Sequence, residues 1–337
     1  MTLLAPPPVS AADHPAAVED LMPLLHQVPD AHRRFDLPET KAGLSGMTSA
    51  LLDRLIALGL PWRAGPDGRL FDRYDLDNIA LYTGRPSLQR MAMRSWRSAL
   101  AALDHPRGPP GLVVDYRLDA AHQRPRPLTV MTAAHGRVVV DGADTPLWRE
   151  DIPPPEPRSP TPLPEPVRRL LTEIMAGLRF FMVREGLRWD SAFSRRTGLA
   201  ECGGAAKLLV RAAREEGFEA RHAFGLILAQ PYATPHFWTE FHIDGRWIAV
   251  DPLLIRVLRA TCGLDPARWH EHRSPGDALL RLSAVAGYDP AGRPLLRGTT
   301  ETGYRLDPIV TAGEEDIPAS FCVTVTTAAA SERKTDA

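Results

Sequence analysis

Residues 198–253 read GLAECGGAAKLLVRAAREEGFEARHAFGLILAQPYATPHFWTEFHIDGRWIAVDPL, and this stretch decides the fold of the chain. It contains Cys202, His236 and Asp251 in that order, within one helical pattern and two strand-like runs. A thiol, an imidazole and a carboxylate that meet in space make a nucleophile able to form and break acyl bonds. The local pattern around each residue predicts that the three can meet.

Cys202 is predicted to lie at or just before the first turn of a helix. Gly217 supplies the C-terminal stop, and apolar residues recur between them at helical spacing. These positions are Ala205, Leu208, Leu209, Ala212 and Ala213. The unpaired N–H groups and positive dipole of a helix start favour a thiolate, and Gly203 and Gly204 leave room for a substrate. A small buried hydrophobe at a helix end is the alternative for the cysteine alone.

The histidine and the aspartate flank a predicted β-hairpin. Two runs rich in aromatic and β-branched residues, 237–243 and 246–250, enclose the pair Asp244-Gly245. Asp-Gly between such runs is typical of a two-residue type I′ turn, which fixes the register of the two strands. This register pairs Ile243 with Arg246, Glu240 with Ala249 and Trp238 with Asp251.

In that register His236 and Asp251 lie on one face of the hairpin as diagonal neighbours, ~7–8 Å apart at the backbone. Asp251 can then accept a hydrogen bond from one ring nitrogen of His236 and leave the other nitrogen facing Cys202. This arrangement fixes the tautomer of the histidine and stabilises its protonated form. A slip of one residue would place the two side chains on opposite faces, so the prediction depends on the turn.

Each residue also has a purely structural interpretation. His236 beside a strand can be a surface or structural residue, and Asp251 before a proline can be a cap or turn residue. Trp238 and Trp247 fit core aromatics better than substrate contacts, and Glu240 fits a partner for a nearby charge. The joint pattern, rather than any one residue, favours catalysis.

The segment resembles the core of the transglutaminase-like superfamily, whose members share a papain-like Cys-His-Asp arrangement. The matching pieces are Cys202 at the helix start, EEGFEARHAFG, HFWTE at 236–240 and WIAVDP at 247–252. The resemblance covers about residues 167–308. It implies an α+β fold with a catalytic helix packed on an antiparallel sheet, preceded by a small helical module and a few short strands. Many members carry an acidic residue two positions after the cysteine, where this chain has Gly204.

The resemblance implies Cys202 as nucleophile, His236 as general base and then general acid, and Asp251 as the orienting residue. An acyl donor would be attacked at its carbonyl carbon to give a thioester, which an amine or water would resolve.

The oxyanion formed in that attack needs hydrogen-bond donors, and the backbone N–H of Cys202 is the natural first one. Trp189 is a candidate second donor through its indole N–H, although a core role fits it better. Gly203 and Trp238 complete the candidate substrate-binding or oxyanion positions.

The main hypothesis is cysteine-dependent acyl transfer at an amide or thioester carbonyl, by amide formation, exchange or hydrolysis. A cysteine peptidase or amidase is one alternative, and a non-catalytic protein-interaction scaffold is another. The expected substrate is a peptide, a protein or a carrier-bound acyl group, with an amine as a possible acceptor. We expect no cofactor and no metal, since His270 and His272 lack further ligands at suitable spacing.

Composition bounds the remaining possibilities. A net charge of −1 gives no electrostatic footprint for nucleic acid or an anionic membrane, and no apolar run approaches a membrane span. The N-terminal residues lack the features of a signal peptide, and 3 cysteines fit a reducing compartment. The composition, rich in Arg, Ala and Pro, favours a GC-rich bacterial genome. We therefore expect a bacterial, cytoplasmic protein.

The rest of the chain divides by composition and periodicity. Helices are predicted from Ser45 or Thr48 to Leu60, over 72–84 and from Ser87 to 103, and strands over 111–119 and 128–141. The predicted parts are a Pro/Ala-rich segment 1–40, a helical module with short strands 41–142, a Pro-rich linker 143–166, a catalytic domain 167–310 and a C-terminal strand with a frayed tail 311–337.

The third predicted helix carries three arginines, Arg90, Arg94 and Arg97, which invite a DNA-binding interpretation. Acidic residues close by in the sequence make a solvated helix face the better interpretation. A recognition or docking module for the substrate is therefore preferred to a DNA-binding unit.

Overall fold

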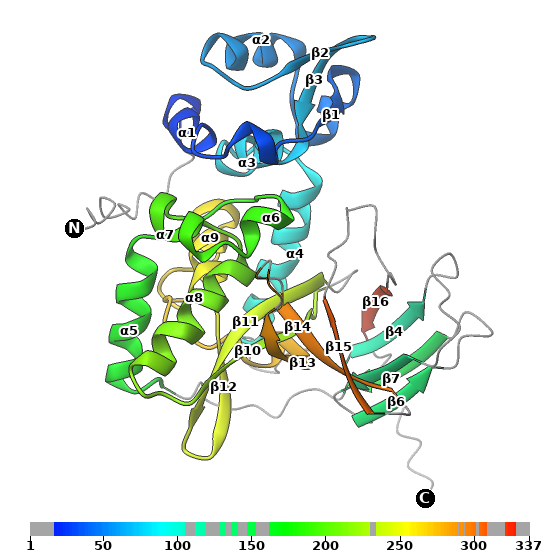
Figure 1. The fold of residues 1–337 in the computed structure, drawn as a ribbon, viewed down its shortest axis with the longest axis vertical. Helices are drawn as coiled ribbons and strands as arrows, with labels where there is room; N and C mark the ends of the chain where they lie inside the picture. The colour runs from blue at the N-terminus through cyan, green and yellow to red at the C-terminus, as the bar shows by residue number, and fades with distance from the viewer. Residues whose placement is uncertain are drawn as a thin grey trace, which may run out of the picture. The chain divides into compact units, whose positions relative to one another are not determined.

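The computed structural model combines helices with antiparallel sheets, which confirms the predicted α+β class (Figure 1). It describes residues 17–104, 112–118, 128–132, 136–140, 147–152, 162–229, 234–288, 290, 292, 294–300, 303–308 and 321–327. The chain splits into two compact units. Unit 1 comprises Met1–Arg97, Pro162–Ala220 and Trp238–Ser274, and unit 2 comprises Ser98–Thr161, Arg221–Phe237 and Pro275–Ala337.

The N-terminal part of unit 1 contains short helices around a small sheet of strand order β1-β3-β2. Its elements are α1 (Val18–Leu25), η1 (Asp30–His32), β1 (Phe35–Pro38), η2 (Glu39–Ser45), α2 (Ser49–Ala57), β2 (Arg63–Gly65), β3 (Gly68–Asp72), α3 (Arg73–Tyr82) and α4 (Leu88–Ala102). The three predicted helices are α2, α3 and α4, and Thr48, Asp72 and Ser87 each accept a first-turn N–H. The caps fix where the helices begin because they satisfy N–H groups that have no partner within the helix.

Two features of this part were not predicted. Residues 1–40 were predicted only as a Pro/Ala-rich segment, with no helix in it, but α1 is a helix with Leu21 and Leu25 fully buried. The small sheet was also missed, since its strands are only three to five residues long and carry little periodic signal.

One hydrophobic core joins the N-terminal helices and the strand β3 to residues 181–199. Leu25, Leu55 and Phe71 pack in the same cluster as Phe181 and Phe193. Asn78 adds a reciprocal pair of hydrogen bonds to the backbone of Met182, each of 2.9 Å. The sequence placed residues 41–142 and 167–310 in separate domains, whereas unit 1 draws on both ranges.

The remainder of unit 1 carries most of the segment that decides the fold, of which residues 221–237 are counted with unit 2. Its elements are α5 (Glu165–Ala176), β8 (Arg179–Phe180), α6 (Glu185–Arg188), α7 (Ser191–Thr197), β9 (Leu199–Ala200), α8 (Cys202–Glu215), β11 (Thr234–Ile243), β12 (Arg246–Val250) and α9 (Pro252–Cys262). Helices α5, α8 and α9 pack against one another (Figure 1). Helix α5 ends at Ala176, directly before Gly177.

Unit 2 is built mainly from strands. β10 (Ala220–Ile227), β13 (Leu279–Tyr288), β14 (Pro294–Thr300) and β15 (Gly303–Pro308) pair antiparallel in that order, and η4 (Gly276–Ala278) precedes β13. A second sheet has the order β16 (Phe321–Thr327), β4 (Leu112–Leu118), β7 (Leu147–Ile152), and β5 (Leu128–Thr132) pairs with β6 (Gly136–Val140).

The sequence predicted β4, β5, β6 and β16, but β7 lies within the predicted linker. Residues 143–146 and 153–161 of the predicted Pro-rich linker 143–166, and the frayed tail over 328–337, lie outside the described residues. Within the part of the chain that is described, no helix is long and apolar enough to cross a membrane.

Candidate active site

Cys202 is the first residue of α8, as the periodicity predicted. The residue is partly exposed, and its thiol forms no disulfide. The preceding residue, Glu201, is the N-cap, with an extended backbone (φ −89°, ψ 172°), and its side chain does not cap the helix. Its carbonyl oxygen accepts the first helical hydrogen bond from Ala205 N at 2.9 Å. Cys202 therefore sits among the first-turn N–H groups, where a helix favours a negative charge.

The two glycines after Cys202 allow α6 to approach the first turn of α8 closely. A Cβ atom at Gly203 would stand 2.4 Å from the ring of Trp189, and one at Gly204 would stand 2.6 Å from the carbonyl oxygen of Arg188. The space that the sequence suggested for a substrate is thus filled by the end of α6. The same contact explains why an acidic residue does not occupy position 204.

Glu201 turns its carboxylate away from α8 and into a buried ionic cluster. One oxygen accepts from Val183 N at 2.8 Å, and the other lies 2.7 Å from Nε of Arg188. Burial raises the pKa of Glu201 above its ordinary value, against the opposing charge of Arg188. Arg188 also contacts Glu185 at 3.0 Å, and both side chains are about nine-tenths buried.

Trp189 belongs to the same cluster. Its indole N–H donates to Glu185, so the structure gives this donor to a carboxylate and not to a position beside the cysteine. The ring is buried, and Lys207 donates to the Trp189 carbonyl oxygen at 2.8 Å. The contacts of Trp189 are those of the core role that the sequence favoured over an oxyanion donor.

The hairpin formed by β11 and β12 has the predicted register. Ile243 pairs with Arg246 and Glu240 with Ala249, and the ladder ends at Thr239 and Val250, one pair before Trp238 and Asp251. Both turn residues have positive φ, 50° at Asp244 and 75° at Gly245, as a type I′ turn requires. The register therefore puts the strand that carries His236 beside the strand that leads to Asp251.

Trp238 and Glu240 lie on one face of β11 and contact each other. The indole N–H of Trp238 donates to Glu240 at 3.2 Å, and both side chains are buried. Thr239 points the other way, and its hydroxyl donates to the carbonyl oxygen of Ala206 at 3.3 Å. This hydrogen bond links β11 to α8 within unit 1, as expected for a helix packed on an antiparallel sheet.

Asp251 lies between β12 and α9 and caps the helix. Its Oδ1 accepts from Leu254 N at 2.9 Å, and Pro252 occupies the first helical position. The cap interpretation from the sequence is thus confirmed for one carboxylate oxygen. A carboxylate accepts through both oxygens, so capping and orienting a histidine are compatible roles.

His236 is buried within β11, two residues before Trp238. The division of the chain falls after Phe237, so His236 is counted with unit 2, while Cys202 and Asp251 belong to unit 1. The strand itself continues from His236 through Trp238 without interruption.

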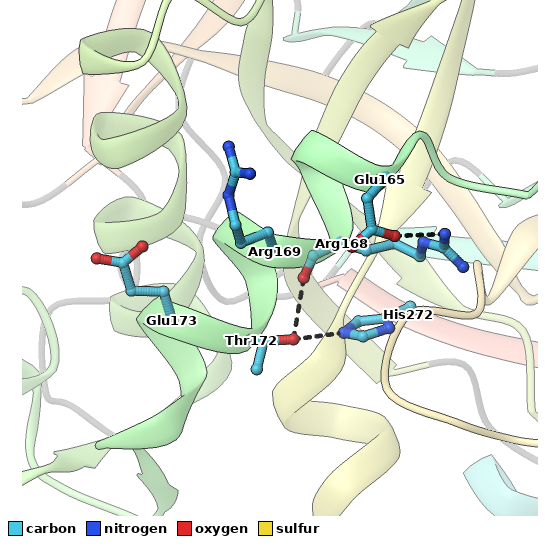
Figure 2. Close-up of a pocket in the computed structure, with 6 residues that line it drawn as sticks. All are labelled: Glu165, Arg168, Arg169, Thr172, Glu173 and His272. Atoms are coloured by element: carbon cyan, nitrogen blue, oxygen red, sulfur yellow. Dashed lines mark hydrogen bonds and ion pairs between the residues drawn. The ribbon is translucent and has the colours of Figure 1, made fainter.

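A separate cavity of about 430 Å³ lies along α5, and its residues do not include any member of the predicted site (Figure 2). Among the residues that line it, Glu165 pairs with Arg168, and Thr172 contacts the ring of His272 at 2.8 Å. Arg169 and Glu173 complete a lining of mixed charge. Among the residues that the structure describes, no group of His, Cys, Asp and Glu has the arrangement of a metal site.

The segment that holds the predicted site matches a known family. A family model described as Transglutaminase-like superfamily matches residues 159–252, which include Cys202, His236 and Asp251. This match confirms the resemblance found in the sequence, and domains of this kind are commonly enzymes. A search of the curated proteins found no match to the chain.

Sequence reasoning missed the ionic cluster behind the cysteine. A signal was present, since Glu185, Arg188 and Trp189 are spaced i, i+3 and i+4, which places them on one side of a helical turn. Nothing in the local pattern relates that turn to Glu201, because the pairing depends on how α6 and α8 pack.

Proposed function

We propose that the chain is a cysteine-dependent acyl-transfer enzyme that acts at an amide or thioester carbonyl. Cys202 is the nucleophile, His236 the general base and acid, and Asp251 the residue that orients the histidine. The observation that carries the proposal is the position of Cys202 at the start of α8, inside the segment that matches the family model. The hairpin register supports the pairing of His236 with Asp251.

The first half of the reaction forms a thioester. The sulfur of Cys202, after its proton passes to His236, attacks the carbonyl carbon of the donor. The carbonyl π electrons move to oxygen, where first-turn N–H groups of α8 can stabilise the charge. The tetrahedral intermediate collapses, the bond to the leaving amine or thiol breaks, and His236 returns the proton to that group.

The second half of the reaction releases the acyl group. His236 accepts a proton from an incoming amine or water, which attacks the thioester carbon. Collapse of the second intermediate expels the Cys202 sulfur, and the proton on His236 restores the resting pair. An amine gives a new amide, whereas water gives the acid.

The first test is alkylation of the three cysteines with iodoacetamide as a function of pH, resolved by mass spectrometry. We expect fast labelling of Cys202 at mildly acidic pH, slowed by His236→Ala. Cys262 is an internal control, since burial raises the pKa of its thiol and should keep it slow. Slow labelling of Cys202 that ignores His236 would favour the non-catalytic scaffold.

The second test incubates the chain with activated acyl thioesters and glutamine-containing peptides, with or without a primary amine. An acyl adduct found by intact mass in wild type and absent in Cys202→Ala is the expected result. Transfer to the amine would establish an acyltransferase, and release of acid alone would establish a peptidase or amidase. No adduct with any donor would count against the proposed chemistry.

A further inference from the structure

Three arms of a buried network converge on Arg188 and reach both neighbours of Cys202 in the sequence. The first arm is the ion pair with Glu201, the residue before Cys202, at 2.7 Å. The side chains of Arg188 and Glu201 are only 11% and 12% exposed, so the pair is shielded from water. The bond from Val183 N holds the second oxygen of the Glu201 carboxylate at 2.8 Å.

The second arm reaches the residue after Cys202. Arg188 holds Glu185 at 3.0 Å, and Glu185 accepts from the indole of Trp189. The ring of Trp189 lies against Gly203, since a Cβ atom placed at Gly203 would stand only 2.4 Å from the ring. The backbone on both sides of Cys202 is therefore braced by one guanidinium group and its partners.

The third arm comes from the N-terminal helices. Tyr74, on α3, hydrogen-bonds Arg188 through its phenol oxygen. The guanidinium of Arg184 stacks over the Tyr74 ring at 4.4 Å and pairs with Asp72 at 2.9 Å. Thus α3, which lies well outside the matched segment, contributes to the surroundings of the cysteine.

We propose that Arg188 and Glu201 are positioning residues for the Cys202 thiol, and that Tyr74 gives the N-terminal helices a part in the same task. This inference rests on the proposed function, because it presumes that Cys202 reacts. The pair has two effects: it fixes the backbone where α8 begins, and it balances the charge of the carboxylate on the residue that precedes Cys202. An unbalanced negative charge there would oppose the thiolate.

A buried ion pair adds little net stability compared with an apolar pair of similar size. Its place beside the nucleophile therefore points to a role in reactivity. The two effects can be measured separately in the rate of Cys202 alkylation as a function of pH. The charge balance sets the pH midpoint of this curve, and the position of the backbone sets its plateau rate.

The test measures Cys202 alkylation against pH in the full chain carrying Glu201→Gln or Arg188→Met. Glu201→Gln keeps the shape and leaves Arg188 unbalanced, so the midpoint should fall by about one pH unit. Arg188→Met removes the brace and leaves Glu201 without its cation, so the plateau rate should fall at least ~5-fold and the midpoint should rise. Arg211→Met is the matched control: Arg211 pairs with Glu215 on the same helix at 2.7 Å, and both are exposed. It should change neither quantity.

Circular dichroism establishes that each variant is folded. A midpoint for Glu201→Gln within about 0.2 pH unit of the wild-type midpoint would overturn the inference. If Arg188→Met does not fold, the result for the isosteric variant Glu201→Gln is the decisive one. If wild-type Cys202 reacts fast and depends on His236, but Glu201→Gln leaves the midpoint unchanged, the inference is wrong and the proposed function stands. Slow wild-type labelling that ignores His236 would sink the proposed function as well.

Discussion

At the scale of the residue, the packing around Cys202 depends on the two glycines that follow it in the sequence. Gly203 and Gly204 have no side chains, so the ring of Trp189 and the carbonyl of Arg188 can lie against the first turn of α8. Resemblance alone would suggest an acidic side chain at position 204. Close packing excludes one, since a Cβ there already meets backbone that cannot swing aside.

Gly204→Ala should therefore destabilise the chain by ~1–3 kcal/mol, because α6 or α8 must shift to admit the methyl group. Urea unfolding at neutral pH measures the effect. Gly43→Ala is the matched control, since a Cβ at Gly43 meets nothing within 4 Å. The control should stay within ~0.5 kcal/mol of wild type. Equal stabilities for the two variants would mean that α6 is not held against α8.

At the scale of the element, Asp251 serves two elements at once. It directly follows the last residue of the strand β12 and caps the helix α9 through Leu254 N. Since Asn is as good an N-cap as Asp, a single substitution can separate the cap from the proposed orientation of His236.

Asp251→Asn should leave the free energy of unfolding within ~0.5 kcal/mol of wild type, because the cap oxygen remains. It should nevertheless lower acyl transfer at least ~100-fold, since an amide that donates to the histidine favours the wrong tautomer. Asp251→Ala should lose both the helix cap and the acyl-transfer activity, and the lost cap should lower the free energy of unfolding by ~1 kcal/mol. Full activity in Asp251→Asn, measured by adduct formation, would limit Asp251 to its cap.

The elements that the sequence predicted best are those with a local chemical cause. Asp244-Gly245 fixed the hairpin register because few residues adopt positive φ, and Cys202 was placed at a helix start by periodicity. The cluster around Arg188 was missed because its pairing with Glu201 depends on how α6 and α8 pack, and because Tyr74 lies on α3, far away in the sequence. The triad itself stays a prediction from pattern and register.

At the scale of the whole molecule, the N-terminal helices belong to the body of unit 1. Leu25, Leu55 and Phe71 share a core with Phe181 and Phe193, so neither part buries its apolar surface alone. Composition could not reveal this, since a Pro-rich stretch between two periodic regions reads as a domain boundary. The same packing buries charged groups of α3, among them Asp75.

Asp75 gives unit 1 a pH dependence that can be measured. Burial raises its pKa from 3.8 to about 7, although Arg33 lies 2.8 Å away and opposes the shift. A carboxyl whose pKa is higher in the folded chain than in the unfolded chain stabilises folding when protonated. Its contribution is therefore complete below the unfolded value and is lost as pH rises through about 7.

Asp75→Asn removes this titration and keeps an oxygen that can accept from Arg33. The stability of wild type relative to Asp75→Asn should therefore fall by roughly 2–3 kcal/mol between about pH 5 and about pH 7. Urea unfolding of both proteins across this range measures it, and titrations common to the two cancel in the difference. A stability difference that does not change with pH would mean that Arg33 keeps Asp75 ionised throughout this range. Burial of the charged groups of α3 would then cost less free energy of folding than their charges suggest.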